Sequence, residues 1–218
     1  MPARRKGNLP AGVRATIDGT GRRFGTVDIV TLAVFYVPEL SPKGPGPWTG
    51  EADKIAWIDP VTGMNCIIRR SIQGHLCGYV AVEADHPLYG CEADGLPFDP
   101  ELKVHGRVSY AQACEHLRPI AKSVWRKPPT ADAGTAWWLG FECNLASDDL
   151  PGRPSRLTGD EHAPSFRDHR DGDVPIPVYR SEAYVYHGCV SLAAQLDAIA
   201  DGAPKLVVSS IPEPEADR

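Results

Sequence analysis

Short runs rich in Val, Ile, Thr and aromatic residues recur along the first two thirds of the chain, and such runs are typical of β-strands. Residues 24–37 predict one strand of about eight residues. The runs "IAWID" and "NCIIRR" flank "PVTG" and predict a hairpin. "LCGYVAV" at 76–82 predicts another strand. Because successive side chains of a strand point to opposite faces, we expect Leu76, Val80 and Val82 on one side and Cys77 and Tyr79 on the other.

Two later runs also have strand character. "ELKVHG" at 101–106 predicts a short strand that ends in a turn, and "TAWWLGFEC" at 135–143 predicts a strand dense in aromatic residues. Residues 1–23 combine basic residues and glycines with little periodicity, so we expect a loose lead-in there.

Two segments have the spacing of an amphipathic helix. In the first, about 109–118, Ser109 is a candidate N-cap. Its apolar positions at i, i+3, i+4 and i+7 are Tyr110, Ala113, Cys114 and Leu117. The second covers about 181–201, and Ser181 is its candidate cap. The apolar stripe of this second helix is Val185, Cys189, Leu192, Leu196 and Ile199.

Proline and glycine are abundant, with 21 of each in 218 residues, and they cluster in 38–50, 127–134 and 150–164. Such clusters form long surface loops. The pattern therefore predicts an α+β protein with a mainly antiparallel sheet built from hairpins, two principal helices and long Pro/Gly-rich loops.

The same pattern predicts three parts along the chain. Residues 1–47 form a loose lead-in, a strand and a Pro-rich connector, residues 48–204 form a single α+β domain, and residues 205–218 form a disordered tail.

Composition narrows the setting. The net charge of −5 argues against nucleic-acid and anionic-membrane partners, which attract clustered Lys and Arg. The chain has no apolar run long enough to span a bilayer, and no apolar segment follows the basic N-terminal residues as in a secretory signal. The six cysteines form no CxxC pair, so we expect reduced thiols and a location in the cytoplasm.

The stretch "LKVHGRVSYAQACEHL" holds the first candidate site. His105 ends a predicted strand, Gly106 permits a positive φ, and Arg107 precedes the capped helix. A helix start, an arginine and a histidine together favour a carboxylate or phosphate. The alternative is an ordinary turn in which Ser109 satisfies the helix end.

A second candidate is the acidic stretch "GFECNLASDD". Its carboxylates could hold a metal or act as acid and base. Asp149 is more simply a residue of a solvated loop. Glu142 lies within an apolar run, where an unpaired carboxylate is costly, so it requires a partner such as Arg107 or His105.

The third candidate is Cys77, a potential thiolate nucleophile with His86 or His105 as its base. The alternatives are core packing for the cysteine and a turn position for His86. The candidates for a divalent metal site are His86, His105, Glu142 and Asp148, but no ligand pair such as HxH or HExxH supports a zinc site.

The order "CGYVAV…HPLYG…VHGRVSYAQAC…WWLGFEC…YRSEAYV…SLAAQL" resembles an uncharacterised family encoded in phage and prophage genomes, over roughly residues 48–200. Members look like CGYVGV, HPxxG, VHGGLTYxxxC, WWFGFDCAHxGD and YRDxxYV. The resemblance implies a phage setting in a bacterial host and no particular reaction. It points to Cys77, His86, His105, Gly106, Tyr110, Glu142, Cys143, Asp148 and the region of Arg180.

The chain departs from that family pattern in the candidate sites. Arg107 replaces a glycine, Ser109 replaces a threonine, and Glu142 stands for Asp. Leu145 stands where the family has His, which weakens a divalent-metal site.

Three functions remain open. The first is a phage accessory protein whose polar pocket (His105, Arg107, Glu142) binds a small anionic, nucleotide-like ligand, with Gly106, Ser109, Tyr110 and His86 nearby. The second is a hydrolase or transferase that uses the same residues, with His105 as acid or base. The third is a protein that blocks a host protein by direct binding. The sequence does not determine the oligomeric state.

Overall fold

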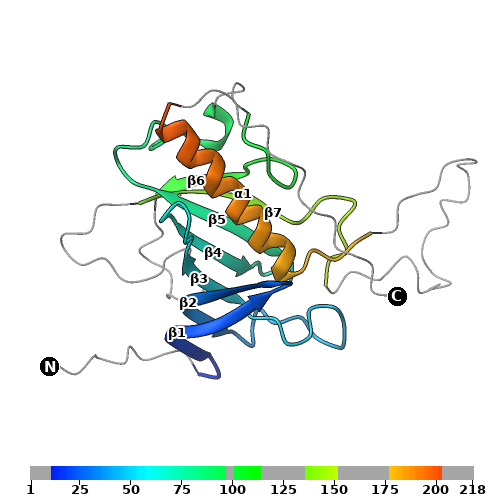
Figure 1. Ribbon diagram of the computed structural model, residues 1–218. Coiled ribbons are helices and arrows are strands. Elements are labelled where there is room, and N and C mark those ends of the chain that lie inside the picture. Colours follow the sequence, from blue (N-terminus) through cyan, green and yellow to red (C-terminus); the bar gives the residue numbers. More distant parts are fainter. Residues whose placement is uncertain (1–10, 97–100, 114–135, 152–176, 203–218) are drawn as a thin grey trace, which may run out of the picture.

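The computed structural model describes residues 11–96, 101–113, 136–151 and 177–202. These residues form a seven-stranded antiparallel sheet crossed by one long helix (Figure 1). The spatial order is β1-β2-β3-β4-β5-β7-β6, so β1 and β6 are the edge strands. The strands are β1 Arg14–Phe24, β2 Val27–Tyr36, β3 Lys54–Ile58, β4 Asn65–Arg70, β5 Leu76–Val82, β6 Tyr110–Ala113 and β7 Trp137–Glu142. The helices are the short 3-10 helix η1 Ala93–Gly95 and α1 Glu182–Ala200.

Consecutive strands from β1 to β5 are neighbours in the sheet. The β3–β4 turn shows how the sequence enforces this arrangement. The Asp59 carboxylate accepts hydrogen bonds from both the backbone N–H and the hydroxyl of Thr62, each at 2.9 Å. Gly63 then adopts a φ of 73°, which other residues rarely adopt. The predicted hairpin over 55–70 is confirmed.

The central strands are buried on both faces, and all seven residues of β5 are buried. One face carries Leu76, Val80 and Val82 and packs beneath α1. The other carries Cys77 and Tyr79 in a second apolar cluster. The predicted division of β5 between two faces is therefore confirmed. Polar residues also divide between the two sides of the sheet, with His105 on the α1 side and Glu142 on the other.

Helix α1 begins and ends as the sequence predicts. The Ser181 hydroxyl accepts a hydrogen bond from the Tyr184 N–H, and the buried stripe includes Val185, Cys189, Leu192 and Leu196. The Phe141 ring lies between Gly78 of β5 and Gly188 of α1, and a Cβ added at either glycine would lie 2.6 Å from it. These two glycines therefore permit the close approach of helix and sheet.

Three predictions along the chain are wrong. Residues 14–23 belong to strand β1 rather than to a loose lead-in, and β1 joins the sheet through β2. Residues 101–106 have no strand structure. Tyr110–Ala113 is strand β6 rather than the first turn of a helix.

The β6 correction has a physical cause. The edge of β7 offers backbone partners, and the Ser109 N–H donates to the Gly140 carbonyl at 2.9 Å. The Tyr110 ring packs edge-on against Tyr79, with centroids 5.2 Å apart. Sheet pairing thus overrides a helical spacing that extends over only a few residues. The rest of that predicted helix, the loops at 127–134 and from 152 to 164, and the tail at 205–218 lie outside the described residues.

The α+β class with a mainly antiparallel sheet is confirmed, with α1 as the main helix of the described chain. No helix in the described ranges combines the length and apolar character needed to cross a bilayer.

Candidate functional site

Polar side chains gather around the start of α1. We call the group formed by His105, Asp148, Arg180 and Tyr184 the His105 centre. Nε2 of His105 lies 2.7 Å from Oδ2 of Asp148, and its Nδ1 lies 3.0 Å from the Tyr184 hydroxyl. His105 and Asp148 are both buried, at 7% and 4% exposure. The imidazole therefore connects a buried carboxylate with a phenol of α1.

Three donors hold Asp148 in place. Besides His105, the Nε of Arg180 donates to Oδ1 at 2.9 Å, and the backbone N–H of Leu145 donates to Oδ2 at 2.8 Å. Asp148 also forms a β-bridge with Val178, which ties its loop to the segment before α1. Backbone pairing and side-chain bonds thus bring the loop and the helix start together.

The charge state of the His105 centre follows from these bonds. Burial acts to raise the pKa of Asp148, but hydrogen bonds from His105, Arg180 and the Leu145 N–H outweigh it and lower the pKa below 3.8. An ionised Asp148 only accepts hydrogen bonds, so His105 carries a proton on Nε2. In the neutral imidazole, Nδ1 is then an acceptor for the Tyr184 hydroxyl.

This order of groups is suited to proton transfer. A carboxylate that orients a histidine, which in turn contacts a hydroxyl, is the arrangement by which proteins activate an O–H group. The Arg180 guanidinium lies over the Tyr184 ring, 4.7 Å from its centroid, where its charge would stabilise a phenolate.

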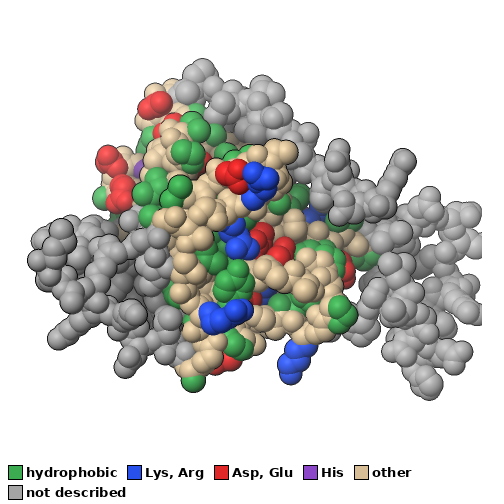
Figure 2. Space-filling view, turned by 60° about the horizontal axis from the view of Figure 1, so that its bottom comes forward, with side chains coloured by type: hydrophobic (Ala, Val, Ile, Leu, Met, Phe, Trp, Pro, Cys, Tyr) green, Lys and Arg blue, Asp and Glu red, His purple; other side chains and the backbone are tan. Residues whose placement is uncertain are grey.

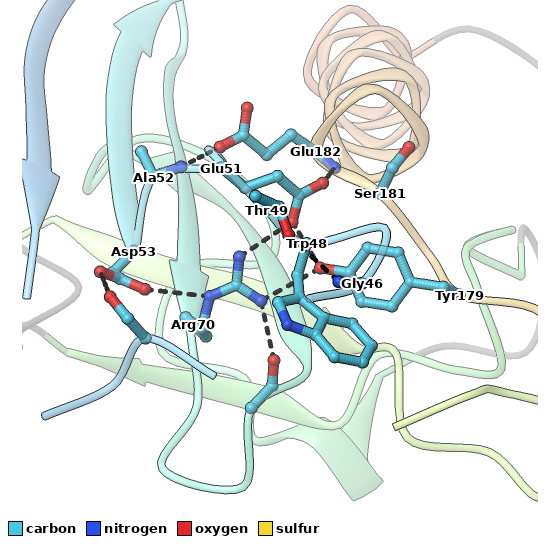
Figure 3. A network of polar contacts seen from close by, with 12 residues as sticks. Gly46, Trp48, Thr49, Glu51, Ala52, Asp53, Arg70, Tyr179, Ser181 and Glu182 are labelled. Atoms are coloured by element: carbon cyan, nitrogen blue, oxygen red, sulfur yellow. Dashed lines mark hydrogen bonds and ion pairs between the residues drawn. The ribbon is translucent and has the colours of Figure 1, made fainter. Parts of the chain in front are cut away.

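A second polar group anchors the helix start, and we call it the Arg70 network (Figure 3). The fully buried Arg70 donates to Asp53 at 3.0 Å, to Glu51 at 2.9 Å and to the hydroxyl of Tyr179 at 3.1 Å. Tyr179 in turn donates to Glu51, and the Trp48 ring packs edge-on against it. The network joins the β2–β3 connection, the end of β4 and the segment before α1.

Glu182 extends this network along the first turn of α1. The Glu51 carboxylate accepts from the Glu182 N–H at 2.9 Å, while the Glu182 carboxylate binds Arg22 and the Ala52 N–H. Burial raises the pKa of Glu182 even though the Arg22 pair opposes it. These bonds fix the orientation of residues 178–184, and hence the positions of Arg180 and Tyr184.

The structure does not form the predicted pocket of His105, Arg107 and Glu142. Arg107 is exposed and pairs with the exposed Asp94 at 3.5 Å. Glu142 pairs with Cys77 across β5 and β7, on the face opposite α1, where it accepts a hydrogen bond from Asn144. His105 contacts α1 itself, so the two residues lie on different sides of the sheet.

Cys77 is a poor candidate nucleophile. Burial, together with the charge of Glu142, raises the pKa of its thiol to about 12. A negligible thiolate fraction remains at neutral pH. Cys77 also faces away from α1, whereas His105 contacts α1, so the predicted pair of Cys77 and His105 is not formed.

His86 has a structural role. Its Nδ1 accepts from the Leu88 N–H at 3.0 Å, and its Nε2 lies 2.9 Å from the Leu196 carbonyl. Both ring nitrogens are thus used to tie the loop after β5 to α1, which argues against a ligand role. Gly106 adopts the expected positive φ, 66°.

Sequence reasoning missed the partners that complete these groups. Tyr184 lies between apolar helix positions, and only the YRDxxYV pattern of the family resemblance includes it. Arg70 ends an apolar strand, and a buried cation requires a partner. An arginine at that position therefore indicates a buried ion pair, and this signal could have identified Arg70 as the centre of a network. Its partners Glu51 and Asp53 precede β3 and look like ordinary surface acids.

A scan against protein-family models found no matching family, and searches of curated proteins and of solved structures found no match either. The chemistry of the His105 centre is therefore inferred from the geometry of the centre itself.

Proposed function

We propose that the protein is a phage or prophage accessory protein that binds a small anionic, nucleotide-like ligand at the His105 centre. The observation that supports this proposal best is the placement of His105 between an ionised carboxylate and a phenol, beside a guanidinium. The phage setting depends on the sequence resemblance alone. In this proposal Arg180 takes the anchoring role expected of Arg107.

The donor inventory of Arg180 supports an anion. Its Nε is bound to Asp148, whereas its two terminal nitrogens make no hydrogen bond to any residue that the structure describes. A guanidinium with both terminal nitrogens available matches the geometry of a carboxylate or phosphate. The first amides of α1 are already used by Glu51 and Ser181, so Arg180 would supply the main attraction.

The charge on one face of the described residues favours a small ligand over a long polyanion. Figure 2 shows acidic and basic side chains of the described residues mixed with hydrophobic ones on the face in view, without a continuous basic patch among them. An extended nucleic acid would require clustered cations along its path.

A hydrolase or transferase at the same centre is the second candidate, and the Asp148–His105–Tyr184 order favours it. His105 would take the proton of Tyr184 or of a water molecule, and Asp148 would orient the imidazole. Binding without turnover would leave a capture protein, whereas product formation would indicate an enzyme.

The test is calorimetric titration with nucleoside monophosphates and inorganic phosphate, followed by chromatography for products. We expect stoichiometric binding of one of them, lost at least tenfold in Arg180→Gln and retained in Arg107→Gln, the matched exposed control. Tyr184→Phe, which removes one hydroxyl, should abolish turnover and spare binding if the centre is catalytic. Binding that persists in Arg180→Gln, or no binding at all, would reject the proposal.

A further inference from the structure

We propose that His75, Cys77 and Glu142 form a site for one Zn²⁺ ion on the face of the sheet opposite α1. One ligand atom from each residue lies within 4.8 Å of the other two. This group is separate from the His105 centre, and neither motif spacing nor resemblance singled out His75.

The sheet itself assembles the three side chains. Cys77 and Glu142 are directly opposite in the β5–β7 register, so their side chains share a face. His75 precedes Cys77 by two residues, and alternation along an extended chain directs it to the same face. Strands β5 and β7, with the residue that precedes β5, therefore hold the three side chains.

The separation of the ligand atoms leaves room for an ion between them. His75 Nε2 lies 3.9 Å from Glu142 Oε2, within ion-pair distance but beyond hydrogen-bond range. Zinc bonds of about 2.0–2.3 Å in a tetrahedron separate ligand atoms by about 3.3–3.6 Å. Small side-chain rotations would close the present spacing to that value.

The imidazole is already oriented for this role. Its Nδ1 lies 3.0 Å from the Ser71 hydroxyl, which leaves Nε2 facing Glu142. Metal-binding histidines commonly fix their second nitrogen through such a bond. His75 and Cys77 are buried, whereas the Glu142 side chain is 38% exposed, so solvent reaches the site from the Glu142 side.

The ligand types select the metal class. Sulfur and imidazole ligands favour Zn²⁺ over Mg²⁺ and Ca²⁺, which prefer all-oxygen sites, and zinc binding would displace the thiol proton of Cys77 because the metal ligand is the thiolate. Three protein ligands with one accessible side is the composition of zinc sites that retain an open position. Nearby, Arg69 donates to the Tyr79 hydroxyl at 3.1 Å, which places a cation beside the site that could attract an anion bound to the metal.

The test uses the full chain without a histidine tag, stripped with a chelator. Calorimetry with Zn²⁺ should give one site per chain, and Co²⁺ should give the near-ultraviolet absorption of a thiolate–metal bond. We expect Cys77→Ser to abolish that absorption and Glu142→Gln to weaken zinc binding at least tenfold. Excess Mg²⁺ should not compete.

Cys143→Ser is the matched control, because Cys143 is also a buried cysteine, next to Glu142 but on the α1 side of the sheet. It should bind zinc as the wild type does. If Cys77→Ser fails to fold, Glu142→Gln alters a half-exposed residue and still decides the question. No stoichiometric zinc binding, or binding that Glu142→Gln leaves unchanged, would overturn the proposal.

Discussion

The Nε2 of His105 and the Oδ2 of Asp148 are 2.7 Å apart, although 43 residues separate them in the sequence. Both residues were visible as candidates in the sequence, but nothing local indicated that they meet. Arg180 and Tyr184, which complete the centre, come from a third segment that the Arg70 network holds in place. The site is therefore a product of long-range packing, and its properties can be tested through the contacts that maintain it.

Asp148→Asn should change how stability depends on pH. The pKa of Asp148 is lowered in the folded protein, so its contribution is present above its ordinary pKa of 3.8 and is lost as pH falls through the folded value. The variant should lose about 1–3 kcal/mol at pH 7, because Arg180 and His105 lose an ionised partner. Urea unfolding between pH 7 and pH 3 should then show a shallower acid decline than in wild type. An equal decline in both proteins would contradict the assignment.

Glu182→Gln should have the opposite pH signature. Burial raises the pKa of Glu182 above 4.5, so its contribution is fully present below that value and is lost as pH rises through the folded pKa. The glutamine side chain of the variant retains an acceptor for the Ala52 N–H. We expect the stability difference between wild type and variant to shift in favour of the variant as pH rises from 4 to 7. A difference that moves in the same direction as for Asp148→Asn would show that the Arg22 pair dominates instead.

Arg70→Ala should be among the most destabilising single changes in the described chain. It leaves the buried carboxylate of Asp53 and the partly buried carboxylate of Glu51 without their cation, and removal of one partner from a buried pair typically costs about 3–5 kcal/mol. Arg23→Ala is the control, since its pair with Asp28 is exposed and such pairs contribute about 0–1 kcal/mol. Urea unfolding of both variants measures the contrast. Similar losses would mean that the network is solvated.

The fold could be predicted where burial imposes a pattern. Strands β2–β5 and β7 are apolar runs between turn residues, and α1 has both a cap and a continuous stripe, so local sequence specifies them. β1 could not be predicted, because an edge strand with exposed arginines such as Arg14 and Arg23 lacks the apolar run. For β6, the partner strand β7 decides between helix and strand, and this information lies outside the segment.

The candidate sites follow the same division. Residues whose side chains can catalyse a reaction or bind a ligand, such as His105, Glu142 and Asp148, could be identified from the sequence. Their pairing could not, because the face of the sheet on which a side chain lies depends on register. His105 meets Tyr184 across 79 residues, and Glu142 is directed to the other face by its pairing with Cys77.

Gly188→Ala tests how closely α1 approaches the sheet. Alanine favours a helix over glycine by about 1 kcal/mol, but a methyl group at this position would lie 2.6 Å from the Phe141 ring. Overpacking a core costs about 1–3 kcal/mol, so the clash should win and the variant should be less stable. Thermal and urea unfolding measure the loss. Phe141→Leu supplies the decisive comparison: in that background the ring is gone, and Gly188→Ala should become neutral or stabilising. A substitution that is equally costly in both backgrounds would show that Phe141 does not set the helix–sheet spacing.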